Sequence, residues 1–342
     1  MRTLIELQKK LYPQLLEKMQ QRYAVLRHVQ LFQPIGRRGL AEKTQLTERI
    51  VRSEVHFLLT QGLIEVTSKG MFITKEGKIV VDELAEFMKE ITGLNVLEMK
   101  IRENLRIDFV KVVSGNSDTM SSVKQAMGQA CTQYLFKHLP NHATIAVTGG
   151  STMAAVAETM FPLENVSSLY FVPARGGIGD KTENEANTIV AKMAHKAKSE
   201  YRLLHVPDPL SETTYQTLIN EPSINDTLQL IKQSNVVIHG IGDALTMAER
   251  RKTKQSTYDK LIANDATSEA FGYYFSADGQ VVHKVRTIGI QLEDLRNTEQ
   301  VITVAGGASK GKAIVSYFKQ GRSHALITDE AAAKEILREY SL

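Results

Sequence analysis

A glycine-rich loop at Thr148–Thr152 contains small and hydroxyl-bearing residues in an order suited to anion binding. Its glycines would let backbone N–H groups approach a phosphate, and a helix beginning here would add the positive potential of its N-terminus. The hydroxyls of Ser151 and Thr152 could donate hydrogen bonds to phosphate oxygens. A tight turn followed by a helix N-cap would explain the same residues, so this loop alone leaves both alternatives open. The candidate anion-binding residues are Gly149, Gly150, Ser151 and Thr152.

A second loop, Pro173–Gly179, places Arg175 beside Gly176 and Gly177. A guanidinium group is a planar, bidentate donor for phosphate or carboxylate oxygens, and neighbouring glycines leave backbone amides accessible. A surface arginine in a flexible loop is the more common alternative. Because the first loop carries similar chemistry, the two loops together favour an anion site.

A third loop, Gly306–Ala313, nearly matches the nucleotide-binding pattern G-x-x-x-x-G-K-[ST]. The match fails at Ala313, which stands where a hydroxyl would hold Mg²⁺. We therefore expect Lys310 to contact a sugar phosphate, and we do not expect this loop to bind ATP.

Motifs for metal and dinucleotide chemistry are missing from the sequence. The nine histidines show no H-E-x-x-H spacing, and Gly240-Ile241-Gly242 lacks the third glycine of a dinucleotide fingerprint. The single cysteine, Cys131, excludes a disulfide framework and any multi-cysteine zinc site. We therefore expect no metal, no cofactor and no enzymatic activity.

The three loops lie in a region of alternating β and α character that begins near Leu105. Strands separated by helices indicate a mostly parallel, doubly wound α/β sheet, in which ligands bind where loops leave the carboxyl ends of strands. The expected strands are 108–113, 144–147, 169–172, 201–206, 235–239, 287–290, 300–304 and 324–327. The expected helices are 119–139, 152–160, 184–198, 310–318 and 330–340.

Charge is divided unevenly along the 342 residues. Residues 1–75 contain 13 Lys and Arg against 6 Asp and Glu, a net charge of +7, whereas the remaining residues contain 29 against 32, a net charge of −3. A basic segment can attract the nucleic-acid backbone and release its counterions. A merely solvated basic face would have the same charge, so the pattern of elements must decide.

The basic segment has the element order of a winged helix-turn-helix. Helical periodicity at 15–31 is followed by a short helix at 40–44, a tight turn, a longer helix to about residue 61, and extended pieces at 63–66 and 71–74. The residues expected on the inward face of the longer helix are Leu46, Val51, Val55, Leu58 and Leu59.

The longer helix would then present its polar face to DNA. Thr47 is its expected N-cap, and Arg49 and Arg52 could form bidentate contacts with guanine edges. Basic residues in the preceding turn and in the wing could contact phosphates. A helical domain that binds protein is the alternative, but charge and pattern together favour DNA. The expected DNA-binding residues are Arg37, Arg38, Thr47, Arg49, Arg52, Ser53 and Lys69.

These regions define two domains. Helical periodicity at 75–98 would connect them, so we expect a DNA-binding domain at 1–92 and an effector-binding and oligomerisation domain at 93–342. Operators are usually read by paired modules, which predicts at least a dimer and allows a tetramer on DNA. Charges interrupt any signal-peptide core in 1–23, and no apolar run reaches the roughly 18 residues of a membrane span. We therefore expect a cytoplasmic protein without membrane contact.

With the winged helix, the three loops and Lys310 in this order, the sequence resembles the SorC family of bacterial transcription regulators along essentially its whole length. The resemblance implies a repressor of glycolytic genes. Its sugar-phosphate-sensing domain would be related in fold to glucosamine-6-phosphate deaminase and ribose-5-phosphate isomerase. The implied ligands are operator DNA and fructose 1,6-bisphosphate.

The resemblance also assigns roles to individual residues. The first loop would bind one phosphate region, and the second and third loops would complete the contacts to phosphate and sugar. Glu269 stands where the family has a polar residue facing the sugar, and Ser151 stands where threonine is frequent, a departure that keeps the hydroxyl. The implied effector-binding residues are Gly149, Gly150, Ser151, Thr152, Arg175, Gly176, Gly177, Glu269 and Lys310.

Two alternatives remain open. A regulator of the same family could respond to a different phosphosugar. Less favoured is an isomerase or deaminase acting on sugar phosphates, which would need a general base near the substrate carbon. Glu269 or Asp243 could supply that base, but neither has an acid–base partner nearby in the sequence.

Overall fold

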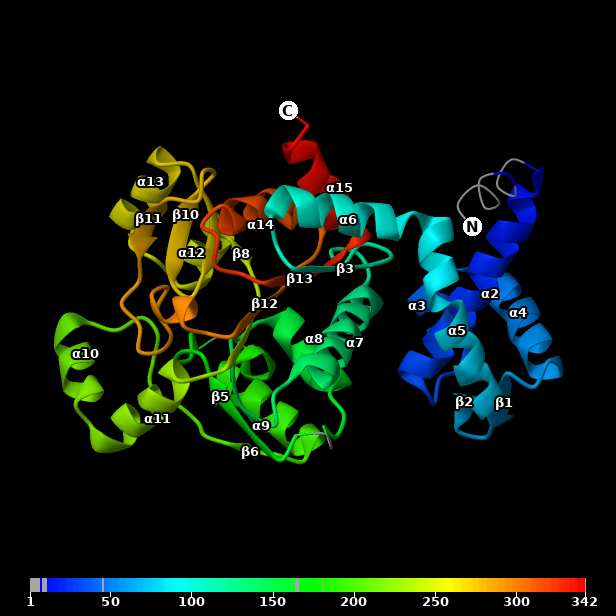
Figure 1. Cartoon of the computed structure of the whole chain (residues 1–342), viewed down its shortest axis with the longest axis horizontal. Helices are drawn as coiled ribbons and strands as arrows, with labels where there is room; N and C mark the ends of the chain where they lie inside the picture. Colours follow the sequence, from blue (N-terminus) through cyan, green and yellow to red (C-terminus); the bar gives the residue numbers. More distant parts are fainter. Residues whose placement is uncertain (1–6, 8–10, 45, 164–165, 180, 342) are drawn as a thin grey trace. The chain divides into compact units, whose positions relative to one another are not determined.

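The computed structural model describes residues 7, 11–44, 46–163, 166–179 and 181–341. The chain divides into two units, Met1–Val96 and Leu97–Leu342 (Figure 1). Sequence analysis expects the division between residues 92 and 93, close to this border. Each unit has its own core and is described by itself.

The first unit is a winged helix-turn-helix. Helix α2 (Pro13–Phe32) begins at a proline, a residue favoured in the first helical turn. Helices α3 (Arg37–Thr44) and α4 (Glu48–Thr60) follow, and the antiparallel strands β1 (Ile64–Thr67) and β2 (Gly70–Ile73) form the wing. The apolar faces of these elements meet in a core that contains Val25, Leu26, Val29, Leu40, Val51, Val55, Leu58, Ile64 and Met71.

Helix α4 has the N-cap that the sequence predicts. Thr47 Oγ1 accepts a hydrogen bond from the N–H of Ile50 at 3.3 Å. The expected inward face is wrong at Leu59, whose side chain is 43% exposed. At 100° per residue, Leu59 lies at the margin of the face centred on Val51 and Leu58, and it turns toward the wing.

Glu54 takes the inward position on α4 that the sequence pattern did not anticipate. Its side chain is 1% exposed and pairs with Lys18 and with Arg22 of α2, the second contact at 3.0 Å. The guanidinium of Arg22 also lies 3.5 Å from the centre of the Phe57 ring. Because two cations neutralise the carboxylate, a charged residue can occupy this buried position.

Gly93 divides the expected connecting helix in two. Helix α5 (Lys75–Thr92) ends before it, and helix α6 (Leu94–Leu105) begins directly after it. Gly93 has a φ of +75°, in the left-handed region that commonly ends helices and that glycine adopts without a steric penalty. The expectation of one helix over 75–98 is therefore wrong.

The second unit is built on a seven-stranded sheet of order β3-β13-β12-β7-β4-β5-β6. All neighbouring strands run parallel, which confirms the doubly wound α/β fold. Helices α7, α8 and α9 pack against one face of the sheet and form the main core with it. The strands are β3 (Phe109–Val113), β4 (His142–Val147), β5 (Ser168–Pro173), β6 (Glu200–Tyr201), β7 (Val236–His239), β12 (Gln300–Val304) and β13 (Ala325–Asp329).

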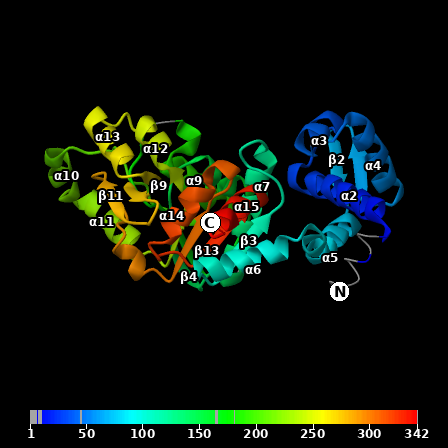
Figure 2. The same cartoon turned by 90° about the horizontal axis from the view of Figure 1, so that it is seen from above.

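The helices of this unit fall into two groups in space. Figures 1 and 2 both place α10 to α13 at the end of the unit away from α7. The five helices expected from the sequence are present within a few residues of their expected bounds. The helices are α7 (Ser121–His138), α8 (Ser151–Thr159), α9 (Ala186–Ala197), α10 (Glu212–Ile219), α11 (Pro222–Lys232), α12 (Ala244–Arg250), α13 (Gln255–Ala263), α14 (Gly311–Phe318) and α15 (Glu330–Glu339).

A second sheet, antiparallel and of order β11-β10-β9-β8, was not expected from the sequence. Helices α12 and α13 pack against it around Tyr274 and Leu261. The expected strand at 287–290 is wrong, because this segment forms only an isolated bridge between Gly289 and Arg175 among the described pairings. Likewise β6 is far shorter than the expected 201–206. The added strands are β8 (Gly242–Asp243), β9 (Ala266–Ala270), β10 (Tyr273–Ser276) and β11 (Val281–Lys284).

Candidate functional site

The three glycine-rich loops leave neighbouring strands at the carboxyl edge of the parallel sheet. Strand β7 lies between β4 and β12, and β5 lies on the other side of β4. Open α/β sheets bind their ligands at this edge. The fold therefore brings the third loop to the same edge as the first two, from which it is separated by more than 100 residues in the sequence.

The first loop ends at a helix N-terminus that has no side-chain cap. Gly150, at a φ of +114°, is the N-cap of α8 and offers no side-chain acceptor for the amides of the first turn. Ser151 Oγ accepts a hydrogen bond from Lys124 Nζ at 3.2 Å. Uncapped first-turn amides beside a lysine are an arrangement suited to an anion.

Lys124, which contacts this helix start, belongs to a group of three cations that repel one another. Desolvation lowers the pKa of Lys310, and repulsion from Lys124 and Arg250 lowers it further, against the attraction of Asp118 and Asp329. Electrostatic repulsion of this kind means that an anion placed among the three cations would be stabilised. Lys310 is a residue that the sequence predicts for the site.

Sequence reasoning missed Lys124 and Arg250. The sequence does contain a pattern that indicates Arg250 as an anion-binding candidate. This residue begins a basic run that continues through Arg251, Lys252 and Lys254, in a part of the chain that is otherwise slightly acidic. No sequence pattern indicates Lys124, because a lysine in the first turn of a helix is common and only the fold brings it to Ser151.

The second loop is tied into the fold through its backbone. The N–H of Gly176 donates to the carbonyl oxygen of Ile288 at 3.2 Å, and the N–H of Gly177 donates to that of Val206 at 3.0 Å. A Cβ atom on Gly176 would lie 2.5 Å from the Val206 oxygen, so the close approach of the two chains requires a glycine there. These amides are engaged within the protein, and their predicted role in anion binding stays a prediction.

Arg175 belongs to a buried network of charges. Its Nε donates to Asp208 Oδ2 at 2.7 Å, its Nη2 contacts the same oxygen, and its Nη1 lies 3.3 Å from Glu269 Oε1. Glu269 Oε1 also accepts from Arg251 Nη2 at 2.9 Å, and Arg251 Nη1 donates to the Tyr274 hydroxyl at 2.9 Å. Two guanidinium groups and two carboxylates thus compensate one another.

The charge state of Glu269 follows from this network. Burial by itself would raise the pKa of the carboxyl, but Arg251 and Arg175 and a hydrogen bond from the N–H of Gly272 hold the pKa below its ordinary value. Glu269 is therefore a stable carboxylate. The predicted residues Arg175 and Glu269, which are distant in the sequence, meet directly.

Adjacent residues at the end of α12 contribute to both clusters. Arg250 repels Lys310 in the group of cations, and Arg251 pairs with Glu269 in the compensated network. The other alternative base, Asp243, caps α12 by accepting from the N–H of Thr246 at 2.9 Å. Asp243 thus has a structural role in the described residues.

A serine pattern that sequence reasoning missed spans Gly307–Gly311, where the letters match G-x-S-x-G between a strand and a helix. The hydroxyl of Ser309 donates to Asp118 Oδ1 at 2.9 Å. A serine nucleophile needs a base that removes its proton, usually a histidine. The partner of Ser309 is a carboxylate that also accepts from its backbone, which indicates a structural contact.

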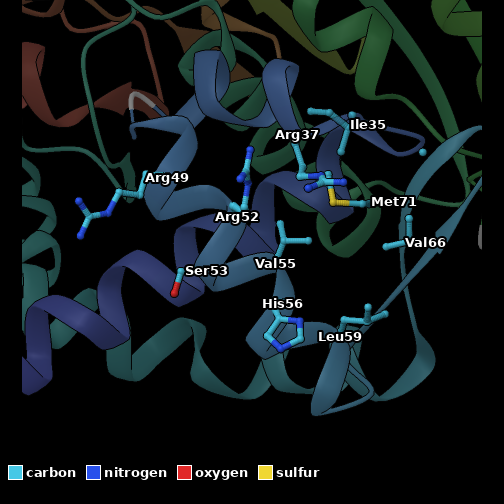
Figure 3. Close-up of a pocket in the computed structure, with 12 residues that line it drawn as sticks. Ile35, Arg37, Arg49, Arg52, Ser53, Val55, His56, Leu59, Val66 and Met71 are labelled. Carbon is cyan, nitrogen blue, oxygen red and sulfur yellow. The ribbon is translucent and has the colours of Figure 1, made fainter.

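In the first unit, predicted DNA-binding residues line one groove between α4 and the wing (Figure 3). Arg49, Arg52 and Ser53 project from the exposed side of α4, and Arg37 reaches the groove from the start of α3. The sequence did not single out the apolar part of this surface. The further lining residues are Ile35, Gly36, Val55, His56, Leu59, Val66, Gly70 and Met71.

The remaining predicted DNA-binding residues lie around this groove. Thr47 is the cap of α4, and Arg38 is 93% exposed, with its Nε 3.9 Å from Glu48. Lys69 lies exposed in the turn of the wing, where its N–H donates to Thr67 Oγ1 at 3.1 Å. Exposed cations thus lie at the turn, the helix and the wing, and their contact with DNA stays a prediction.

The described part of the chain contains no group of three or more His, Cys, Asp or Glu side chains that could hold a metal ion. It also contains no helix that combines the length and apolar character needed to cross a bilayer.

Comparisons with known proteins match both units. A family model described as the CggR N-terminal DNA binding domain matches residues 18–88, and a model of a sugar-binding domain matches residues 89–338. The central glycolytic genes regulator of Priestia megaterium is 53% identical over 342 residues, covering 100% of both chains. The protein of that name from Bacillus subtilis is 47% identical over 99% of this chain and 100% of its own.

Two solved structures of SorC regulators also match this chain. A SorC family transcriptional regulator from Enterococcus faecalis is 45% identical with a TM-score of 0.67, over 70% of this chain and 99% of that one. The full-length sorbitol operon regulator SorC from Klebsiella pneumoniae has a TM-score of 0.68 at 16% identity, over 89% of this chain and 94% of its own, and it shows the shared fold.

Proposed function

The chain belongs to the SorC family of transcriptional regulators, and on this basis we propose that it represses central glycolytic genes under the control of a phosphorylated sugar. The winged helix would hold operator DNA, and the effector would be fructose 1,6-bisphosphate. The names of the relatives that match over the full length support the regulated genes. Binding of the effector would change operator affinity through its different affinity for two states of the protein.

The observation that carries the effector proposal is the mutual repulsion of Lys124, Arg250 and Lys310, with Lys124 beside the uncapped start of α8. A phosphate dianion supplies the negative charge that this group lacks. Ser151 and Thr152, in the first turn of α8, would add hydroxyl donors.

A bisphosphate needs a second anion-binding end. Arg175 is the proposed donor at that end, and its guanidinium pairs with Asp208 and Glu269. A second phosphate would compete with Asp208 for Arg175, and Glu269 would then be available to a sugar hydroxyl. A monophosphate would leave the network around Arg175 unchanged, which is why a bisphosphate is favoured.

An enzymatic role is less consistent with the site. A general base works best when its pKa lies near the working pH, and the arginines lower the pKa of Glu269. Asp243 is committed to the cap of α12. We therefore infer a regulator, and a regulator of the same family that answers to another phosphosugar is the second candidate.

The proposed assembly follows from the DNA-binding unit. Paired half-sites in operators call for at least a dimer, and two dimers on one operator would give a tetramer. A regulator of glycolytic genes would act in the cytoplasm. Sedimentation of the protein with and without an operator fragment would measure the assembly.

The function is tested by a gel shift on the promoter fragment upstream of this protein's own operon. Fructose 1,6-bisphosphate, fructose 6-phosphate and dihydroxyacetone phosphate are titrated separately. Lys124→Ala should lose the response, and the matched variant Lys137→Ala, an exposed lysine at the other end of α7, should keep it. Arg175→Ala should lose the distinction between bisphosphate and monophosphate.

Each result of the gel shift decides between the candidates. A response to the bisphosphate alone supports the glycolytic repressor. A response to another phosphosugar keeps the regulator and changes its effector. No binding of DNA would refute the role of the first unit, and isomerisation or deamination of hexose phosphates by the wild-type protein would restore the enzyme.

A further inference from the structure

The glycine-rich loop between β12 and α14 has its backbone N–H groups occupied by carboxylates of the chain itself. The N–H of Gly307 donates to Asp329 Oδ2 at 2.7 Å, and the N–H of Ser309 donates to Asp118 Oδ2 at 2.9 Å. In a nucleotide-binding loop the corresponding amides cradle phosphates. In this loop, carboxylates accept from the amides of Gly307 and Ser309, and those of Ala308 and Lys310 donate to Asn116 Oδ1 and the Gly307 carbonyl oxygen, so we expect an anion to be contacted by the side chain of Lys310.

The glycines of this loop are explained by the same carboxylates. A Cβ atom on Gly307 would overlap the carboxylate of Asp118, and one on Gly306 would lie 2.7 Å from Asp329 Oδ2. The near match to a nucleotide-binding pattern therefore reflects the close approach of two acidic side chains to the backbone.

The two carboxylates differ in how firmly they are held. Asp329 is fully buried and also accepts from the N–H groups of Ser117 and Ala332, at 2.8 Å each. Asp118 is exposed, and its two oxygens bind the N–H and the hydroxyl of Ser309, at 2.9 Å each. Water can replace an exposed carboxylate at little cost, whereas the buried one is a fixed part of the core.

Asp118 lies within the electrostatic field of the cations proposed to hold a phosphate. Desolvation, Lys124 and Arg250 lower the pKa of Lys310, and Asp118 and Asp329 raise it. Asp118 thus stabilises the charge of Lys310 while the site is empty. A phosphate dianion at Lys310 would in turn be repelled by Asp118.

We propose that Asp118 is a positioning residue that holds the Lys310 loop in the empty site and opposes a phosphate bound at Lys310. The proposal rests on the proposed function and adds to it how the site responds to its ligand. When the phosphate binds, repulsion weakens the contact of Asp118 with Ser309. Asp118 is then released from Ser309, while Ser117 stays hydrogen-bonded to Asp329 and Asn116 to Ala308.

The segment that carries Asp118 is joined to the element that enters the second unit. It follows β3, an edge strand whose Val112 N–H donates to Glu98 of α6 at 2.9 Å. Glu98 also lies 3.5 Å from Lys111 Nζ. Helix α6 follows α5 of the DNA-binding unit along the chain, so a displacement after β3 acts on the segment that connects the two units.

The test compares Asp118→Asn with Asp118→Ala in the full-length protein. Asparagine keeps an acceptor for the N–H of Ser309 and can donate to its hydroxyl, but it removes the charge. Calorimetric titration with fructose 1,6-bisphosphate, and separately with inorganic phosphate, should show about threefold to tenfold tighter binding to Asp118→Asn at low salt. Asp118→Ala should bind more weakly than Asp118→Asn, because the loop loses its contact.

A control separates a local effect from net charge. Asp278 is an exposed acid (86%) that pairs with Lys319 at 3.6 Å, and Asp278→Asn removes the same charge. The affinity of Asp278→Asn for fructose 1,6-bisphosphate and for inorganic phosphate should equal that of the wild type. Equal tightening in Asp278→Asn would overturn the proposal, as would unchanged or weaker binding in Asp118→Asn.

The outcome also distinguishes this proposal from the function on which it rests. If the wild type binds neither ligand, the proposed function has failed. If the wild type binds and Asp118→Asn binds no more tightly, the effector site stands and the role of Asp118 is wrong. A purely structural role would show equal affinities for the wild type and Asp118→Asn and a loss in Asp118→Ala.

Discussion

Replacing Glu269 by glutamine tests whether water is excluded from the buried network of charges, as its geometry indicates. Glu269 is 5% exposed, and its Oε1 accepts from Arg175, Arg251 and the N–H of Gly272. Glutamine keeps an oxygen acceptor and nearly the same volume. What Glu269→Gln removes is the negative charge, which leaves two buried guanidinium groups with Asp208 as their counterion.

The expected loss is large because removing one partner leaves charge buried without compensation. Breaking a buried ion pair in this way costs about 3–5 kcal/mol. For a domain of this size, each kcal/mol corresponds to a shift of roughly 2–4 °C in Tm. We therefore expect Glu269→Gln to lower the Tm of the second unit by roughly 6–20 °C, measured by calorimetry at pH 7.

An exposed ion pair gives the matched control. Glu212 Oε2 lies 2.6 Å from Arg286 Nη2, and the two side chains are 60% and 45% exposed. Glu212→Gln should cost less than about 1 kcal/mol, because water already solvates both groups. If Glu269→Gln costs no more than Glu212→Gln, water reaches the network and the argument from burial is wrong.

The pH dependence gives a second test of the same reasoning. The pKa of Glu269 is depressed in the folded protein, so its stabilising charge is fully present above the unfolded value of about 4.3. This contribution is lost as pH falls through the lower folded pKa. The gap in unfolding free energy between the wild type and Glu269→Gln should therefore shrink below pH 4.3, since protonated Glu269 is neutral like glutamine.

Three further predictions concern other residues. Burial lowers the pKa of His239 from 6.5 to about 4, so the unfolded chain binds more protons between these values and stability should fall as pH drops; unfolding free energies from urea titrations at pH 7 and 5 should differ by about 2 kcal/mol more in the wild type than in His239→Gln. Gly128→Ala should lower the unfolding free energy from a urea titration by roughly 1–3 kcal/mol, because its Cβ would lie 2.6 Å from a carbonyl oxygen of α8. Gly36→Ala is the control: its Cβ would have nothing within 4 Å, so the loss should be less than about 0.5 kcal/mol. Arg52→Ala should weaken operator binding by about 1–3 kcal/mol and relax its base preference. Lys69→Ala should reduce the slope of log binding constant against log salt concentration by about one. The reverse pattern would mean that Arg52 contacts phosphate and Lys69 reads bases.

Local patterns in the sequence predicted much of the first unit. Alternation between helical periodicity and short extended pieces marks the winged helix, and Thr47 marks the start of its longer helix. These signals depend on contacts within a few residues, so they are visible in the chain itself. The exception, Glu54 in place of Leu59 on the inward face of α4, depends on the cations of α2.

In the second unit, the sequence predicted the class of fold and the loops. The five longer helices and most strands of the parallel sheet follow from alternating patterns, and glycine-rich turns indicate where strands end. The antiparallel sheet was missed, although β9, β10 and β11 are as long as strands of the parallel sheet that were predicted. The segment 287–290 was wrongly expected to be a strand because buried apolar residues in a loop show the same alternation.

The sequence by itself determined the parts of the candidate site: the glycine loops, Arg175, Lys310 and a basic first unit. Only the tertiary structure decided how their charges combine. In the structure, Asp208 and Glu269 pair with Arg175, whereas Lys124 and Arg250 repel Lys310. The carboxylates of Asp329 and Asp118 accept hydrogen bonds from two amides of the third loop. Electrostatic energy depends on distance in space and on burial, and neither quantity can be read from the separation of residues along the chain.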